Sequence, residues 1–187
     1  MSSDAKCFGG ECLPRLPIEE IYAIALEIWP DPALAAEMAA TAMSESGGIP
    51  NRLGKAGEYG LWQIHPMHFD PTHAEWIGAD KYNNPLKKLG IIDGEGQSLS
   101  DPRINARAAD AIARHLDRYT DHWDEGDLDM DTVFYGRRDN PDFSLFLEQA
   151  QALIGSDPLP TPPDEPLDDL GPGNSEFDPP TFTTRVE

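Results

Sequence analysis

The stretch AMSESGGIPNRLGKAGEYGLWQIHP, residues 42–66, marks the change from a helical pattern to an irregular one. Apolar residues recur at helical spacing from Leu34 onward, and Gly47 and Pro50 then stop the helix. Glu45 therefore lies at a predicted helix C-terminus. The helix dipole and any apolar wall beside it both oppose ionisation of a carboxylate at that end. The pattern predicts an acid that stays protonated near neutral pH.

Two blocks of this stretch carry a resemblance to a known family. The first, Glu-Ser-Gly-Gly-x-Pro-Asn, begins at Glu45, and the second, Tyr-Gly-Leu-Trp-Gln-Ile, begins at Tyr59. Together they resemble the lysozyme-like superfamily, most closely the phage-type soluble lytic transglycosylase domains. An Asp-Pro-x-x-Asn helix start at Asp101 extends the resemblance, which covers about residues 18–155.

The resemblance implies a mainly α, lysozyme-like helical domain with a small loop or hairpin region lining a glycan cleft. It also implies cleavage of the β-1,4 bond between N-acetylmuramic acid and N-acetylglucosamine in peptidoglycan, with Glu45 as the catalytic acid. Glu58 stands where animal-type lysozymes carry a second carboxylate, so it is a candidate second catalytic residue. A solvated loop glutamate is the alternative. No metal and no cofactor are expected.

Candidate substrate-binding residues lie around these two blocks and further along the chain: Ser46, Tyr59, Gly60, Gln63, Asn105 and Tyr135. Gln63 could pair with the N-acetyl and hydroxyl groups of an amino sugar, or be a buried amide bonded to backbone. Tyr59 is expected near the cleft, where it could stack on a sugar, and Trp62 in the wall. Ser46 either bonds near the acid or caps the helix. Asn105 either orients Glu45 or the substrate, or is a polar residue at a helix start.

Hydrophobic residues at helical spacing predict four main helices, over residues 17–29, 33–45, 102–119 and 142–154. Short helical pieces are expected around residues 73–81 and 85–89. The predicted organisation is an irregular N-terminal arm (1–16), a lysozyme-like catalytic domain (17–155) and an extended or disordered tail (156–187). That tail contains eight prolines and eight acidic residues against one arginine.

The net charge of −20 over 187 residues excludes some partners. An acidic surface repels polyanions, so nucleic acid and anionic membranes are poor partners, and no run is apolar enough to insert into a membrane. The N-terminus lacks the pattern of an ordinary secretory signal. A cell-wall substrate then predicts a bacteriophage virion protein in the tail, or a lysin released to the host periplasm. Other phage tail proteins could bind the arm or the acidic tail.

Three smaller questions stay open. Cys7 and Cys12 flank a plausible turn and could form a disulfide or remain free thiols. The His65, His68 and His73 run does not share one helical face, so zinc is not predicted. A chitosanase-like glycosidase and a catalytically silent structural tail component are the competing functions.

Overall fold

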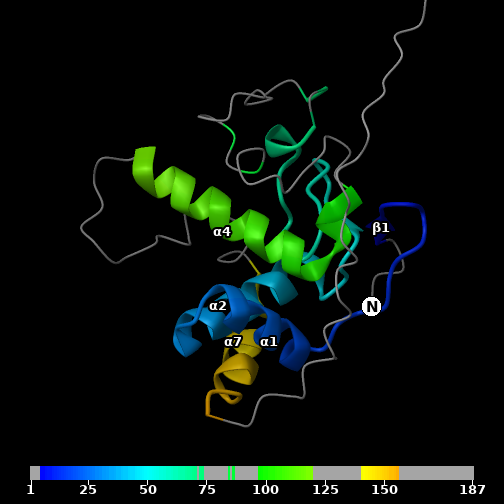
Figure 1. The fold of residues 1–187 in the computed structure, drawn as a ribbon. Coiled ribbons are helices and arrows are strands. Elements are labelled where there is room, and N and C mark those ends of the chain that lie inside the picture. Colours follow the sequence, from blue (N-terminus) through cyan, green and yellow to red (C-terminus); the bar gives the residue numbers. More distant parts are fainter. Residues whose placement is uncertain are drawn as a thin grey trace, which may run out of the picture.

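The computed structural model describes residues 5–70, 72–73, 84, 86, 97–119 and 140–155. Most of this part of the chain is helical, in α1 (Ile18–Ile28), α2 (Pro32–Ser46), α4 (Pro102–Tyr119) and α7 (Phe143–Gln151). Two short 3-10 helices, η1 (Pro66–His68) and η2 (Gln97–Ser100), and two short strands, β1 (Lys6–Cys7) and β2 (Arg52–Leu53), complete it. The predicted mainly α fold is confirmed (Figure 1).

The first two helices lie within one residue of the predicted bounds, 17–29 and 33–45, at each end. Pro17 precedes α1, and Asp31 caps α2 by accepting hydrogen bonds from the backbone N–H of Ala33 (2.8 Å) and Leu34 (2.9 Å). At the other end of α2, Gly47 adopts a left-handed φ of 64°, a conformation that favours glycine. This glycine cap places Glu45 in the last turn of the helix.

The helix α2 packs against both α1 and α7, while α4 contacts α1. Figure 1 shows α4 (green) and α7 (gold) on opposite sides of the α1 and α2 pair. Small side chains allow this close packing, because five alanines of α2 are completely buried: Ala35, Ala36, Ala39, Ala40 and Ala42. The alanine-rich helix that carries Glu45 is thus held from two sides.

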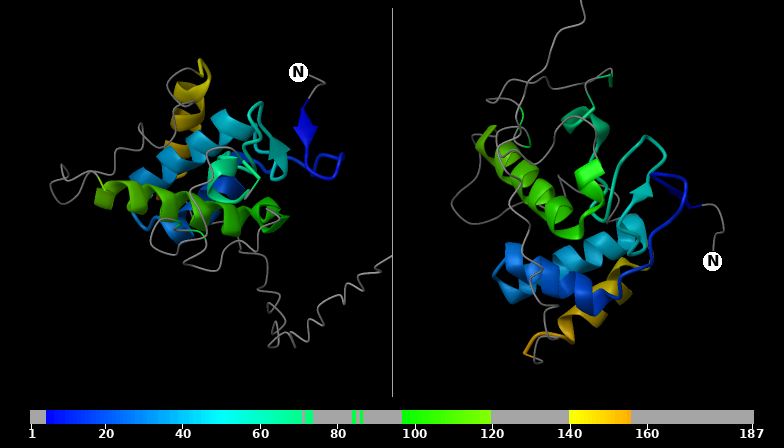
Figure 2. Two further views of the ribbon diagram at one scale, coloured as in Figure 1. Left: turned by 90° about the horizontal axis from the view of Figure 1, so that it is seen from above. Right: turned by 45° about the vertical axis from the view of Figure 1, so that its right-hand side comes forward.

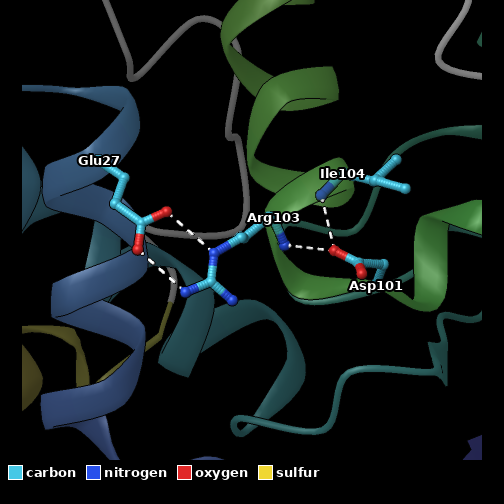
Figure 3. Close-up of polar contacts among 4 residues, drawn as sticks. All are labelled: Glu27, Asp101, Arg103 and Ile104. Atoms are coloured by element: carbon cyan, nitrogen blue, oxygen red, sulfur yellow. Dashed lines mark hydrogen bonds and ion pairs between the residues drawn. The ribbon is translucent and has the colours of Figure 1, made fainter. Parts of the chain in front are cut away.

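The start of α4 is tied to α1 by polar contacts (Figure 3). Asp101 accepts hydrogen bonds from the backbone N–H of Arg103 (2.8 Å) and Ile104 (3.0 Å), as expected of an N-cap. The Arg103 guanidinium makes two contacts of 2.9 and 3.0 Å with the Glu27 carboxylate of α1. Both side chains are well exposed, so this ion pair contributes at most about 1 kcal/mol to stability and mainly orients α4.

The N-terminal segment is not wholly irregular, which corrects the expectation for residues 1–16. β1 pairs antiparallel with β2, with Cys7 opposite Arg52, and Cys7 forms a disulfide with Cys12. Figure 2 shows this blue segment alongside the cyan hairpin of residues 52–64, which begins with β2. The sequence pattern does not predict these strands, because a two-residue strand is too short to show an alternating pattern.

Several predictions concern parts of the chain outside the described residues. They are the predictions for Tyr135, for the tail from residue 156 onward, and for the short helices between residues 73 and 89. Most of the range 73–89 lies outside the described residues. The last helix is shorter than expected, since α7 ends at Gln151 and a turn follows to Gly155. Among the described helices, none has the length and apolar composition needed to cross a membrane.

Candidate active site

Glu45 is a partly buried carboxylate near the end of α2. It projects from the last turn of α2, and among the described residues no N–H or O–H group donates to it and no cation pairs with it. Burial raises the pKa of Glu45, and the negative charge of Glu58 raises it further. The predicted protonated acid is therefore supported, with burial as the main cause.

Ser46 closes the helix that carries this acid. Its hydroxyl donates to the Ala42 carbonyl (2.7 Å) and accepts from the backbone N–H of Gly48 (3.1 Å). The side chain is completely buried, so it cannot contact a glycan. Of the two predicted roles, the structure supports the cap and not substrate binding.

Glu58 lies in a tight turn of the hairpin that follows β2. The Gly54 N–H donates to the Glu58 carbonyl (2.8 Å), and the Ala56 N–H donates to Oε2 of the Glu58 side chain (2.9 Å). Leu53 and Tyr59 form an antiparallel bridge directly beside this turn. The turn therefore orients the partly exposed carboxylate of Glu58. Because the charge of Glu58 raises the pKa of Glu45, the two carboxyl groups lie near each other.

The side chains of Gln63 and Glu58 both lie against the backbone of Gly54. A Cβ at Gly54 would collide with the Glu58 carboxylate and with Oε1 of Gln63, so both groups lie directly against this glycine. Nε2 of Gln63 donates to the carbonyls of Gly60 (2.7 Å) and Arg52 (3.3 Å). Within the described part of the chain Oε1 accepts no hydrogen bond, so the amide pairs with backbone through its nitrogen and keeps an acceptor for a ligand.

The backbone of Gln63 is in an unusual conformation. Its φ is 46°, and it is the one non-glycine residue with positive φ among those described. Such a conformation costs about 1 kcal/mol or more and persists where surrounding contacts impose it. The two hydrogen bonds of Nε2 are such contacts, and they fix the direction of the side chain.

Asn105 holds the segment between Tyr59 and Trp62 against α4. Its Oδ1 accepts from the Trp62 N–H (2.8 Å), and its Nδ2 donates to the carbonyls of Tyr59 (3.1 Å) and Leu99 (3.0 Å). A Cβ on Gly60 would collide with this amide, which explains the glycine there. Both residues are buried, so the predicted substrate contacts of Asn105 and Gly60 are wrong, and both serve to position the hairpin.

Tyr59 belongs to the core and not to a sugar-stacking surface. Only 2% of it is exposed, and its ring packs edge-on against Phe8 and Phe69. Burial raises the pKa of Tyr59, and the nearby Ser100 hydroxyl opposes this rise in part. Trp62 is buried as predicted, and its indole N–H donates to the Met38 carbonyl (3.0 Å).

The histidine run has a local structural role. Nδ1 of His65 accepts from the Met67 N–H (3.3 Å) at the start of η1, and its ring meets that of His73 edge-on. In the ranges that the structure covers, no three His, Cys, Asp or Glu side chains gather as a metal site would require.

Asn51 is a buried residue whose role the sequence does not reveal. It bonds to three backbone groups of the N-terminal segment, through contacts with Phe8, Glu11 and Leu13. Its position in the Glu-Ser-Gly-Gly-x-Pro-Asn block is the only sequence signal, and that block does not indicate its partners. The arm is thereby fastened to the hairpin that carries Glu58.

Together these residues form an acid and a carboxylate with different environments. Glu45 is partly desolvated and has no hydrogen-bond donor or cation partner among the described residues, whereas Glu58 accepts a hydrogen bond and is partly solvated. Two nearby carboxyl groups in such different environments can serve as a proton donor and a stabilising negative charge. This is the chemistry that cleavage of a glycosidic bond requires.

A family model described as transglycosylase SLT domain matches residues 31–125. The match begins at the Asp31 cap of α2 and includes Glu45, Glu58, Gln63 and the start of α4. The N-terminal segment and α7 lie outside it. No curated protein and no solved structure matches the chain significantly.

Proposed function

This chain belongs to the transglycosylase SLT domain family, and we propose that it cleaves the β-1,4 bond between N-acetylmuramic acid and N-acetylglucosamine with Glu45 as acid and base. Membership of this family implies lytic transglycosylase activity on peptidoglycan. The observation that carries the assignment of Glu45 is its pKa, raised by burial at the end of α2. A carboxyl group with a raised pKa keeps its proton to higher pH than an ordinary glutamate does, and it can donate that proton to a leaving oxygen.

The reaction proceeds through two proton transfers at Glu45. Its carboxyl group protonates the glycosidic oxygen, the bond from that oxygen to C1 of the muramyl ring breaks, and positive charge develops at C1. The Glu45 carboxylate then removes the proton of the muramyl 6-hydroxyl as that oxygen attacks C1. The products are a free N-acetylglucosamine 4-hydroxyl and a 1,6-anhydro muramyl end, and Glu45 is again protonated.

The other two polar side chains assist without forming bonds to the sugar. The Glu58 carboxylate keeps Glu45 protonated and stabilises the positive charge at C1. The free Oε1 of Gln63 accepts a hydrogen bond from the N–H of an N-acetyl group, while Nε2 remains on its backbone carbonyls. Because the 6-hydroxyl belongs to the substrate, its position replaces a second catalytic group.

The test is mass spectrometry of the products that the protein releases from purified sacculi. Muropeptides with 1,6-anhydro ends are expected. Reducing muramic acid ends would instead show that water attacks, the lysozyme outcome, and the coupling of Glu58 to Glu45 is the observation that favours this second candidate. Cleavage of chitosan but not sacculi would support a chitosanase, and no cleavage of either would support a silent structural protein.

We also propose a location. The protein acts as a bacteriophage virion component in the tail, or is released to the host periplasm, with the N-terminal arm or the acidic tail docking to other tail proteins. The sequence resemblance to phage-type domains supports this placement. Immunogold labelling of purified particles tests it, and particles without label that come from lysates containing the protein would contradict a virion location.

A further inference from the structure

Two arginine side chains donate hydrogen bonds to backbone carbonyls at the end of α2. Nη1 of Arg15 donates to the Gly47 carbonyl (3.1 Å), and Nη1 of Arg52 donates to the Ser46 carbonyl (3.3 Å). These carbonyls belong to the two residues that follow Glu45. Arg15 comes from the N-terminal segment and Arg52 from β2, so the contact between the arm and the hairpin brings two guanidinium groups to the residues that follow Glu45.

Neither guanidinium has an acidic partner among the described residues. The whole chain has 34 acidic and 14 basic residues. Arg103 and Arg114, by contrast, each form an ion pair with a carboxylate. A guanidinium has five N–H donors, and one contact to a carbonyl leaves enough of them for bidentate binding of an anion.

We infer that Arg15 and Arg52 form an anion subsite for the free carboxylates of the peptide stems on muramic acid. This inference rests on the proposed function. The stem is attached to the sugar whose C1 is cleaved, so it leaves the glycan close to Glu45 and to the end of α2. A protein with a net charge of −20 repels an anionic wall, and a local pair of cations offsets that repulsion where the substrate must bind.

A purely structural role is the competing explanation, because cations near a helix C-terminus also stabilise the helix. Binding measurements separate the two roles. Soluble stem-bearing glycan fragments are prepared in native form and with their carboxylates converted to methylamides, which leaves any wall phosphate charged. Isothermal titration in the Glu45→Gln background gives a Kd for each form without turnover.

The anion subsite predicts a Kd about five- to tenfold lower for native than for methylamidated fragments, as expected for charge-assisted contacts. Adding Arg15→Gln and Arg52→Gln should make the two Kd values equal. Adding Arg107→Gln, which changes an exposed arginine of α4, should leave the difference intact. Equal Kd values already in the Glu45→Gln parent, or a difference that survives loss of both arginines, would overturn the subsite.

Two further readouts keep the outcome unambiguous. If the variant lacking both arginines does not fold, the salt dependence in the parent decides. Kd should rise with ionic strength for native fragments and stay constant for methylamidated ones, and identical salt dependence would overturn the subsite. Cleavage of sacculi by the wild-type protein tests the proposed function separately, so a failure of one claim is distinguishable from a failure of the other.

Discussion

At Glu45 the environment that suits an acid catalyst also affects stability. Below the usual glutamate pKa of 4.5 the side chain is protonated in both the folded and the unfolded chain. As the pH rises, the unfolded chain releases its proton first, because the folded pKa is raised. Ionisation therefore favours unfolding until the pH exceeds the folded pKa, and Glu45 lowers stability at neutral pH.

Replacing this group gives the first prediction. Glu45→Gln should be as stable as the wild type at about pH 4 and more stable at about pH 8, because the amide does not ionise. Urea denaturation at the two pH values measures the difference. Glu19→Gln, at an exposed position of α1, is the control. A variant that is less stable than the wild type at the higher pH would contradict the burial of an unpaired carboxylate.

The second prediction concerns the charge of Glu58. Glu58→Gln removes a negative charge that raises the pKa of Glu45, so Glu45 should lose its proton at a lower pH. Cleavage of sacculi needs protonated Glu45, and its alkaline limb should therefore move to lower pH. The pH profile of the rate measures this shift. An unchanged alkaline limb would show that the two carboxyl groups do not interact.

At the scale of elements, the turn at Gly60 sets the hairpin against α4. Gly60→Ala should destabilise the fold by roughly 3 kcal/mol or more, because it adds a clash with Asn105 and Leu99 to the cost of positive φ. Gly57→Ala is a matched control, since Gly57 also has positive φ but a Cβ there meets only Pro66 at an ordinary distance. It should lose only about 1 kcal/mol. Equal losses in denaturation midpoints would rule out the close approach to Asn105.

The N-terminal segment is an element that the SLT match does not include, yet Asn51 ties it to the hairpin. Asn51→Ala should remove three partly buried hydrogen bonds to that segment, at a cost of about 1 kcal/mol for each. Hydrogen exchange should accelerate at the Leu13 amide, which loses its acceptor, while the amides of α7 remain protected. Unchanged exchange at Leu13 would mean that the disulfide and the strand pairing suffice to hold the segment.

Helices and their ends could be predicted from the sequence, because they depend on residues three or four positions apart. Gly47 and Asp101 signal helix ends locally and act as predicted, and Asp31, for which no role is predicted from the sequence, caps α2. Glu45 was predictable for the same reason. Its place in the last turn of α2 is set by Gly47, the left-handed cap that ends the helix.

The roles of the neighbouring polar residues could not be predicted in this way. Asn105 bonds to Tyr59 and Trp62, more than forty positions away in the chain, and this pairing decides that it is a buried positioning residue. Tyr59 is buried because Phe8 covers it, and Phe8 belongs to a segment that has no periodic pattern. Whether a polar or aromatic residue faces a substrate thus depends on contacts that local spacing does not contain.

At the scale of the whole molecule, each part of the fold contributes to the site. The packing of α2 against α1 and α7 positions Glu45, and Asn105 of α4 holds the hairpin in place. The hairpin in turn orients Glu58 and Gln63. The central claim is that this arrangement serves a single acid whose removal abolishes glycan cleavage without unfolding the protein.

The release of soluble muropeptides from purified sacculi tests that claim most directly, with wild-type, Glu45→Gln and Glu19→Gln proteins compared at one pH. Glu45→Gln should lower the rate by roughly 10²–10⁴-fold, as expected for loss of a general acid, while its circular dichroism and melting temperature show an intact fold. Glu19→Gln should match the wild type. Turnover by Glu45→Gln at the wild-type rate would contradict the assignment of Glu45 and with it the proposed mechanism.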